Sequence, residues 1–125
     1  MTKIPEIVKT SWNHRKGPIV FATVDQNGNA NVIYATCVTM YDDQTVVIAN
    51  NYFSKTIQNI HSGSRGSVLF ISEDGYAIQL KGSITYYQDG PIFDDMKKWN
   101  PEKHPGLGAA ALNIEEIYNG AEKLL

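Results

Sequence analysis

The sequence predicts a mainly β fold, a small six-stranded antiparallel barrel with short peripheral helices. Six segments have the alternation and the β-branched or aromatic content of strands, and they follow one another in meander order with turn residues between them. The strand–helix–strand alternation of parallel sheets is not present. The chain has 125 residues, 42% of them hydrophobic and 19% charged, and no linker that would separate domains. We therefore expect one globular domain over residues 1–125.

A short amphipathic helix is predicted at the start of the chain. It is indicated by four apolar residues at positions i, i+3, i+4 and i+8, which are Ile4, Ile7, Val8 and Trp12. Pro5 is tolerated in a first helical turn, and Gly17-Pro18 ends the helix.

The strands come next. The six predicted strands are Ile19–Val24, Ala30–Tyr41, Thr45–Ala49, Gly66–Ser72, Tyr76–Tyr87 and Ala109–Ile114. Asn27-Gly28 can take the positive φ angles of a tight hairpin between the first two, and Asp42-Asp43 and Glu73-Asp74-Gly75 are turn sequences. The pattern leaves open whether Glu115–Tyr118 continues the last strand or becomes helical.

Two short helices interrupt the strands. Between Asn50 and Gly63, Ile57 and Ile60 are three residues apart, Ser54 can cap a helix start, and Gly63 suits a helix end. Later, Pro91 opens a helix after Asp89-Gly90. The apolar stripe of this second helix consists of Ile92, Phe93, Met96 and Trp99.

Charge and composition exclude several classes of function. The formal net charge is −2 and no run of basic residues is longer than two, so we expect neither a nucleic-acid nor a membrane partner. A single cysteine, Cys37, and three scattered histidines do not match a metal site. Met1–Thr10 lacks the apolar core of a signal peptide, so we expect a cytoplasmic protein.

The most informative segment runs from Ala49 to Ile60, where a strand leads through a polar loop into a helix start. There the hydroxyls of Ser54 and Thr56, the ammonium of Lys55 and the free amides of the first turn can converge on a small anion such as phosphate. The glycine framework of a P-loop is absent. The alternative is a plain serine cap followed by a solvated lysine.

At this point the sequence resembles a known family, the FMN-binding split barrels related to pyridoxamine 5′-phosphate oxidase, and within it the small FMN-binding proteins. The resemblance covers nearly the whole chain and lies in the order and spacing of several stretches. These are Val32-Ile33-Tyr34-Ala35-Thr36, Val46–Asn51, Ser54-Lys55-Thr56 with Asn59, Lys81-Gly82-Ser83, and Asp89-Gly90-Pro91.

The resemblance implies a split β-barrel that holds FMN at a homodimer interface. The phosphate would lie near Ser54, Lys55 and Thr56, and the isoalloxazine ring along the backbone of Tyr34, Ala35 and Thr36 and of Ala49, Asn50 and Asn51. Small side chains at Ala35 and Ala49 would let a flat ring approach a strand, although ordinary barrel packing would also select alanine. Trp99 and Leu124-Leu125 are apolar groups available for the contact between subunits.

If FMN is bound, the cofactor supplies the redox chemistry, and no catalytic side chain is required. The expected function is an FMN-dependent oxidoreductase that passes hydride or electrons between a reduced donor and a small-molecule acceptor. The oxidase proper grips its vitamer phosphate with additional basic residues that have no matching cluster here, which argues against vitamin B6 oxidation. The alternatives are a non-catalytic FMN carrier, or a relative that binds deazaflavin or haem. A single-strand nucleic-acid barrel is opposed by the net charge.

Overall fold

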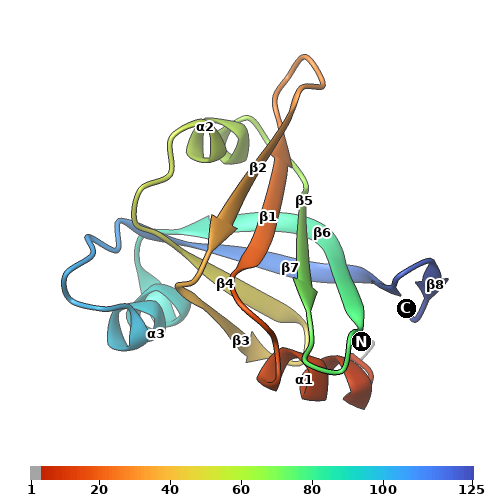
Figure 1. Cartoon of the computed structure of the whole chain (residues 1–125). Helices are drawn as coiled ribbons and strands as arrows, with labels where there is room; N and C mark the ends of the chain where they lie inside the picture. The colour runs from red at the N-terminus through yellow and green to blue at the C-terminus, as the bar shows by residue number, and fades with distance from the viewer. Residues whose placement is uncertain (1–3) are drawn as a thin grey trace.

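The computed structural model describes residues 4–125, which form one curled antiparallel sheet with three short helices outside it (Figure 1). Residues 1–3, which belong to the N-terminal segment expected to lack a signal peptide, lie outside the described residues. The helices are α1 Glu6–Asn13, α2 Lys55–His61 and α3 Gly90–Trp99. The strands are β1 Ile19–Val24, β2 Ala30–Ala35, β3 Val38–Asp42, β4 Thr45–Asn50, β5 Gly66–Ile71, β6 Ala77–Tyr87, β7 Gly108–Asn119 and β8 Glu122–Lys123. The mainly β split-barrel prediction is confirmed.

The sheet has one seam. Its strand order is β2-β1-β5-β6-β7-β4-β3, with β8 paired to β7, so β2 and β3 are consecutive in the chain yet lie at opposite edges of the sheet. The chain crosses between the two edges at Thr36 and Cys37, where the amide of Val38 donates to the carbonyl of Thr36 at 3.1 Å. The prediction of one strand over Ala30–Tyr41 was therefore wrong, because a curled sheet needs a bend where its two edges meet. This break and the short β8 raise the strand number to eight.

The main core fills the inside of the curled sheet. It contains the inward side chains of the central strands, including Phe21, Phe70 and Leu80, all of them buried. Helix α1 closes one end of it, with Trp12 packed edge-on against Phe70 at a ring-centroid distance of 5.2 Å. Three members of the predicted apolar stripe are buried, but Ile7 is 37% exposed and faces away from this core.

A second, smaller core lies under α3. Met96 is fully buried there against small and β-branched residues from the outward faces of β4 and β7, namely Val47, Ala49, Ala109 and Ala111. The predicted stripe of α3 is confirmed, since Ile92, Phe93 and Trp99 pack on the same cluster. Helix α3 therefore fixes the outer face of β4 and leaves the outer faces of β1, β2 and β5 uncovered by a helix (Figure 1).

Two local predictions needed adjustment. The hairpin between β1 and β2 has a positive φ only at Gly28 and not at Asn27, since the loop spans five residues and is closed by the amide of Gly28 donating to the carbonyl of Asp25. Strand β7 continues through Glu115–Tyr118, with Glu115 as an extra residue where the pairing with β6 shifts at Lys81 and Gly82. No helix in the described residues is long and apolar enough to cross a membrane.

Candidate functional site

An open cleft of about 310 Å³ lies at the seam of the sheet. We call it the Tyr34 cleft. It is lined by the end of β2, the segment after β4 and one residue of the loop after α3, which together are Ile33, Tyr34, Ala35, Thr36, Cys37, Asn51, Tyr52, Phe53 and His104. The structure thus brings four of the nine predicted site residues, Tyr34, Ala35, Thr36 and Asn51, into one cleft.

The β2 side of this cleft is open. Strand β2 pairs only with β1, so the backbone groups along its other edge have no neighbouring strand. Tyr34 is 77% exposed, and Ala35 contributes only a methyl group at the cleft. A flat ligand could therefore approach this edge closely and form hydrogen bonds to main-chain N–H and C=O groups.

The end of β4 has different surroundings. Ala49 is 4% exposed and packs under α3, and its amide donates to the carbonyl of Cys37 at 3.0 Å. Asn50 donates from its side chain to the hydroxyl of Tyr86 at 2.7 Å and accepts the amide of Phe53 at 3.0 Å. These two predicted residues lie behind the cleft, where their polar groups already have protein partners.

Asn51 is the anchor of the loop after α3. Its side chain exchanges two hydrogen bonds with that of Asn100, at 3.0 and 2.9 Å, and it also accepts the amide of Gly106 at 2.9 Å. Gly106 has a φ of +53°, and a Cβ there would press on the Asn100 amide. Because Asn51 and Asn100 are both buried, the position of this loop is fixed by bonds that water does not replace.

The start of α2 lies beside a second open hollow, of about 330 Å³, which we call the Lys55 hollow. Lys55 lines it together with residues from the β1–β2 loop, the start of β2 and helix α2. These are Asp25, Asn29, Ala30, Asn31, Gln58 and Asn59. Ser54 occupies the predicted cap position and is exposed, but its side chain makes no capping hydrogen bond. Thr56 is buried, and its hydroxyl accepts a hydrogen bond from the side chain of Asn31 at 3.0 Å.

The Lys55 hollow also contains a carboxylate. The pKa of Asp25 lies below its ordinary value, mainly because the backbone and side-chain N–H groups of Asn29 donate to it, with a further bond from the amide of Asn27. Asp25 therefore remains charged to low pH and organises the hairpin loop. Lys55 is the one cation among the residues that line this hollow.

His104 and Tyr52 also line the cleft, although neither was among the site residues predicted from the sequence. The hydroxyl of Tyr52 lies 3.1 Å from Nδ1 of His104, and their rings meet edge to face. His104 lies 52 residues further along the chain, in a polar loop that carried no motif, so its place in the cleft depends on the Asn51–Asn100 anchor. The adjacent polar residues Asn50 and Asn51 were the available signal, since polar side chains after a buried strand need partners.

The comparisons with known proteins agree with this architecture. The family model for pyridoxamine 5′-phosphate oxidase matches residues 9–119. An uncharacterised protein of Methanocaldococcus jannaschii is 30% identical over 120 residues, which cover 91% of this chain and 78% of that protein.

Two solved structures support the same fold. An FMN-binding protein from Syntrophomonas wolfei subsp. wolfei superposes with a TM-score of 0.74 at 22% identity, over 87% of this chain and 80% of that one. An F420 reductase has a TM-score of 0.68 at 13% identity, over 92% and 98% of the two chains. The chain therefore belongs to the pyridoxamine 5′-phosphate oxidase-like family of FMN-binding split barrels.

Proposed function

We propose that this protein binds FMN along β2, with the isoalloxazine ring at the Tyr34 cleft and the phosphate at the Lys55 hollow. The observation that carries the proposal is the open edge of β2 between these two sites. Asn31 lines the Lys55 hollow and Ala35 lines the Tyr34 cleft. The two residues are four positions apart on β2, so the sites are separated by about 13 Å, at roughly 3.3 Å per residue of strand. An elongated ligand with a flat ring at one end and an anion at the other fits this arrangement.

The phosphate end has donors of two kinds. The Lys55 ammonium and the Ser54 hydroxyl belong to exposed residues, so both groups can reach a ligand. Thr56 takes part through its neighbour, because its buried hydroxyl positions the Asn31 side chain at the same end of β2. Asp25 opposes an anion there, but its oxygens are turned to the amides of its own loop.

At the ring end, the open strand edge supplies backbone donors and acceptors, and Tyr34 supplies an aromatic face. The last residues of β4, Ala49 and Asn50, support the cleft from behind. Asn51, which follows the strand, lines the cleft. Bound FMN would supply reversible hydride or electron transfer, while the protein positions the ring and limits access to it. We propose an oxidoreductase with a small-molecule donor or acceptor, and the alternative is a carrier of FMN without turnover.

We further propose that two copies of the chain close the site. Neighbouring strands β2, β1 and β5 present a row formed by Tyr34, Val20 and Leu69, which the register places side by side. Val32 and Ile71 extend this face, and the exposed fractions of the large side chains are high: 60% for Val32, 77% for Tyr34, 39% for Leu69 and 53% for Ile71. A contiguous apolar surface of this kind is typical of an interface, and Tyr34 belongs both to it and to the cleft.

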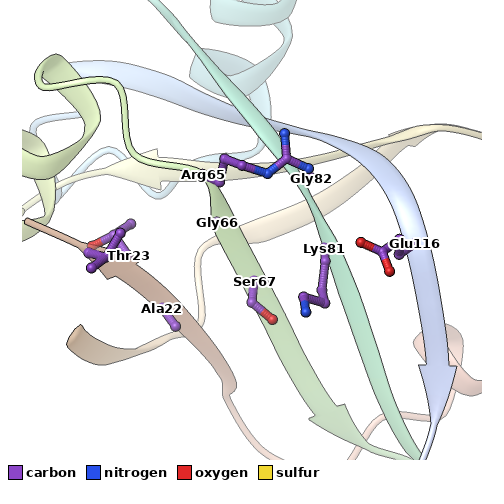
Figure 2. A pocket seen from close by; sticks show the side chains of 9 residues that line it. Ala22, Thr23, Arg65, Gly66, Ser67, Lys81, Gly82 and Glu116 are labelled. Atoms are coloured by element: carbon purple, nitrogen blue, oxygen red, sulfur yellow. The ribbon is translucent and has the colours of Figure 1, made fainter. Parts of the chain in front are cut away.

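The face becomes polar toward β6 and β7. Figure 2 shows Ser67 and Lys81 on neighbouring strands, with Glu116 beyond them and Arg65 at the upper end of a shallow hollow of about 300 Å³. Small residues such as Ala22 and Gly66 form its floor. A mixed polar rim beside an apolar centre is the usual composition of a protein interface. Leu124, Leu125 and Trp99, expected as contact groups, are partly buried against the protein's own two cores.

The absorption spectrum of freshly purified protein tests the cofactor. We expect a yellow protein that releases FMN on denaturation. The F420 reductase among the structural neighbours makes a deazaflavin the second candidate, and its spectrum, like that of haem, differs from that of FMN. Colourless protein that also fails to take up added FMN would contradict the proposal.

Two further measurements address turnover and assembly. Steady-state reduction of acceptors with NAD(P)H distinguishes an oxidoreductase from a carrier, for which no turnover is expected. Light scattering should give twice the mass of the chain, and Leu69→Asp should reduce it to the mass of one chain by placing a charge in the apolar face. A monomer that retains FMN would contradict closure of the site by a second copy.

A further inference from the structure

His104 lies where two open clefts meet. It lines the Tyr34 cleft and also a neighbouring cleft of about 430 Å³ beneath Trp99 and Lys103, and Thr36 and Cys37 line both clefts as well. Its loop cannot move freely, because Asn51 holds Asn100 and Gly106, and Lys97 donates to the carbonyl of Pro105 at 3.0 Å. The loop that carries the imidazole is therefore anchored beside the Tyr34 cleft.

The Tyr52 hydroxyl also fixes which ring nitrogen is available. Nδ1 of His104 is 3.1 Å from this hydroxyl, and Nε2 has no hydrogen-bond partner among the described residues. When the hydroxyl donates to Nδ1, the neutral imidazole carries its proton on Nε2, and when the imidazole is charged both nitrogens carry protons. In these two states Nε2–H is a donor, and it is the stronger donor in the charged state; the neutral tautomer in which Nδ1–H donates to the Tyr52 oxygen would make Nε2 an acceptor.

Four titratable side chains line the two clefts beside His104. Lys103 precedes it in the loop and lines the cleft beneath Trp99, Tyr34 comes from the end of β2, the Cys37 thiol from the link between β2 and β3, and the Tyr52 hydroxyl from the segment after β4. Of the described residues that line either cleft, none is aspartate or glutamate. The acceptor for Nε2–H must therefore come from a bound molecule or from water.

We propose that His104 donates a hydrogen bond from Nε2 to the ring system of the flavin, with Tyr52 as the residue that positions it. This inference rests on the proposed binding of FMN at the Tyr34 cleft and names a protein contact to the ring that no sequence motif indicates. Because protonation of the imidazole strengthens the bond and adds a positive charge beside the ring, the electronic spectrum of the bound flavin depends on the charge of His104. Histidine is the side chain that ordinarily changes charge between pH 5 and 8.

The experiment is a visible absorption titration of the flavin complex from pH 5 to pH 8. The probe is riboflavin as well as FMN, because the FMN phosphate also titrates in this range and riboflavin has no phosphate. We expect a reversible spectral change with both probes in the unaltered protein and its loss in His104→Asn. Tyr52→Phe should retain the change with a smaller amplitude, since it removes only the positioning hydroxyl.

His14→Asn is the matched control. His14 lies at the end of α1 with Nδ1 against the carbonyl of Thr10 and lines neither cleft, so this variant should keep the spectral change. A flavin complex whose spectrum does not change with pH, or that changes equally in His104→Asn, would overturn this inference while leaving FMN binding intact. Failure of both probes to bind would instead contradict the proposed function.

Discussion

The end of β2 and the end of β4 lie next to each other in the fold, but their backbones are used differently. β2 has a strand on one side only, whereas β4 lies between β3 and β7 and is covered by α3. Ala35 therefore borders an open cleft, while Ala49 is buried with its amide bonded to Cys37. Two alanines in similar strands thus have different surroundings, one beside an open cleft and one in the packing behind it.

On the proposed function, this difference would let a flat molecule bind without a deep cavity. The unpaired edge offers main-chain groups, and the fully paired strand beside it keeps that edge in place. Asn51 connects the paired strand β4 with the cleft, because it directly follows β4 and also lines the cleft. Its side chain bonds to that of Asn100 in the loop after α3. Substitutions at the paired strand should therefore change stability, and substitutions at the open edge should change binding.

The largest change in stability is expected for Asn51→Leu. It leaves the buried amide of Asn100 and the N–H of Gly106 without their partner, and each unsatisfied group costs about 1–3 kcal/mol. We expect the free energy of unfolding, measured in urea, to fall by about 3 kcal/mol. Tyr52→Phe, which removes only an exposed hydrogen bond, should change it by less than about 0.5 kcal/mol. Equal effects of the two variants would show that the loop is not anchored through Asn51.

A smaller loss is expected for Ala49→Leu. The added carbons enter the packed space between β4 and α3, and such overpacking costs about 1–3 kcal/mol. The affinity of the folded fraction for FMN should remain unchanged, because the Ala49 side chain faces α3 and not the cleft. A large loss of flavin affinity without a loss of stability would move Ala49 into the binding surface.

The opposite result is expected for Tyr34→Ala. Tyr34 is 77% exposed, so stability of the monomer fold should change by less than about 0.5 kcal/mol. Flavin affinity should fall by severalfold to about tenfold, as the loss of one aromatic contact of about 0.5–1.5 kcal/mol implies. Isothermal titration with FMN measures the effect. Unchanged affinity would mean that the ring does not contact this edge.

The smallest effect concerns the loop beside β2. The folded-state pKa of Asp25 is lowered by the N–H groups of Asn29, so its stabilising effect is present above the unfolded pKa, near 3.8, and is lost as pH falls through the folded pKa. Asp25→Asn should therefore be slightly less stable than the unaltered protein at neutral pH and equally stable in strong acid. Denaturation curves at several pH values test this. A difference that persists in acid would exclude the carboxylate as its origin.

Much of this fold could be predicted from local patterns. Alternation identified the strands, and Ser54 and Gly63 marked α2 because cap positions depend on neighbouring residues alone. The break at Thr36–Cys37 could not be predicted, since these residues suit a strand and the bend comes from the closure of the sheet. For the same reason the site was predicted only in part. Open and paired strand edges have the same sequence pattern, and His104 reaches the cleft through contacts 49 residues apart.

We propose that Lys55 and its neighbours recognise the phosphate while the ring is held elsewhere. Titration by quenching of flavin fluorescence, with FMN and riboflavin in parallel, tests it most directly. Bonds involving a charged group are worth about 1.5–3 kcal/mol each, so losing two should weaken riboflavin binding about a hundredfold or more. Lys55→Ala should remove part of this preference and leave riboflavin affinity unchanged, whereas Lys98→Ala, at an exposed position of α3, should preserve it. Equal affinities for FMN and riboflavin in the unaltered protein would contradict phosphate recognition by Lys55.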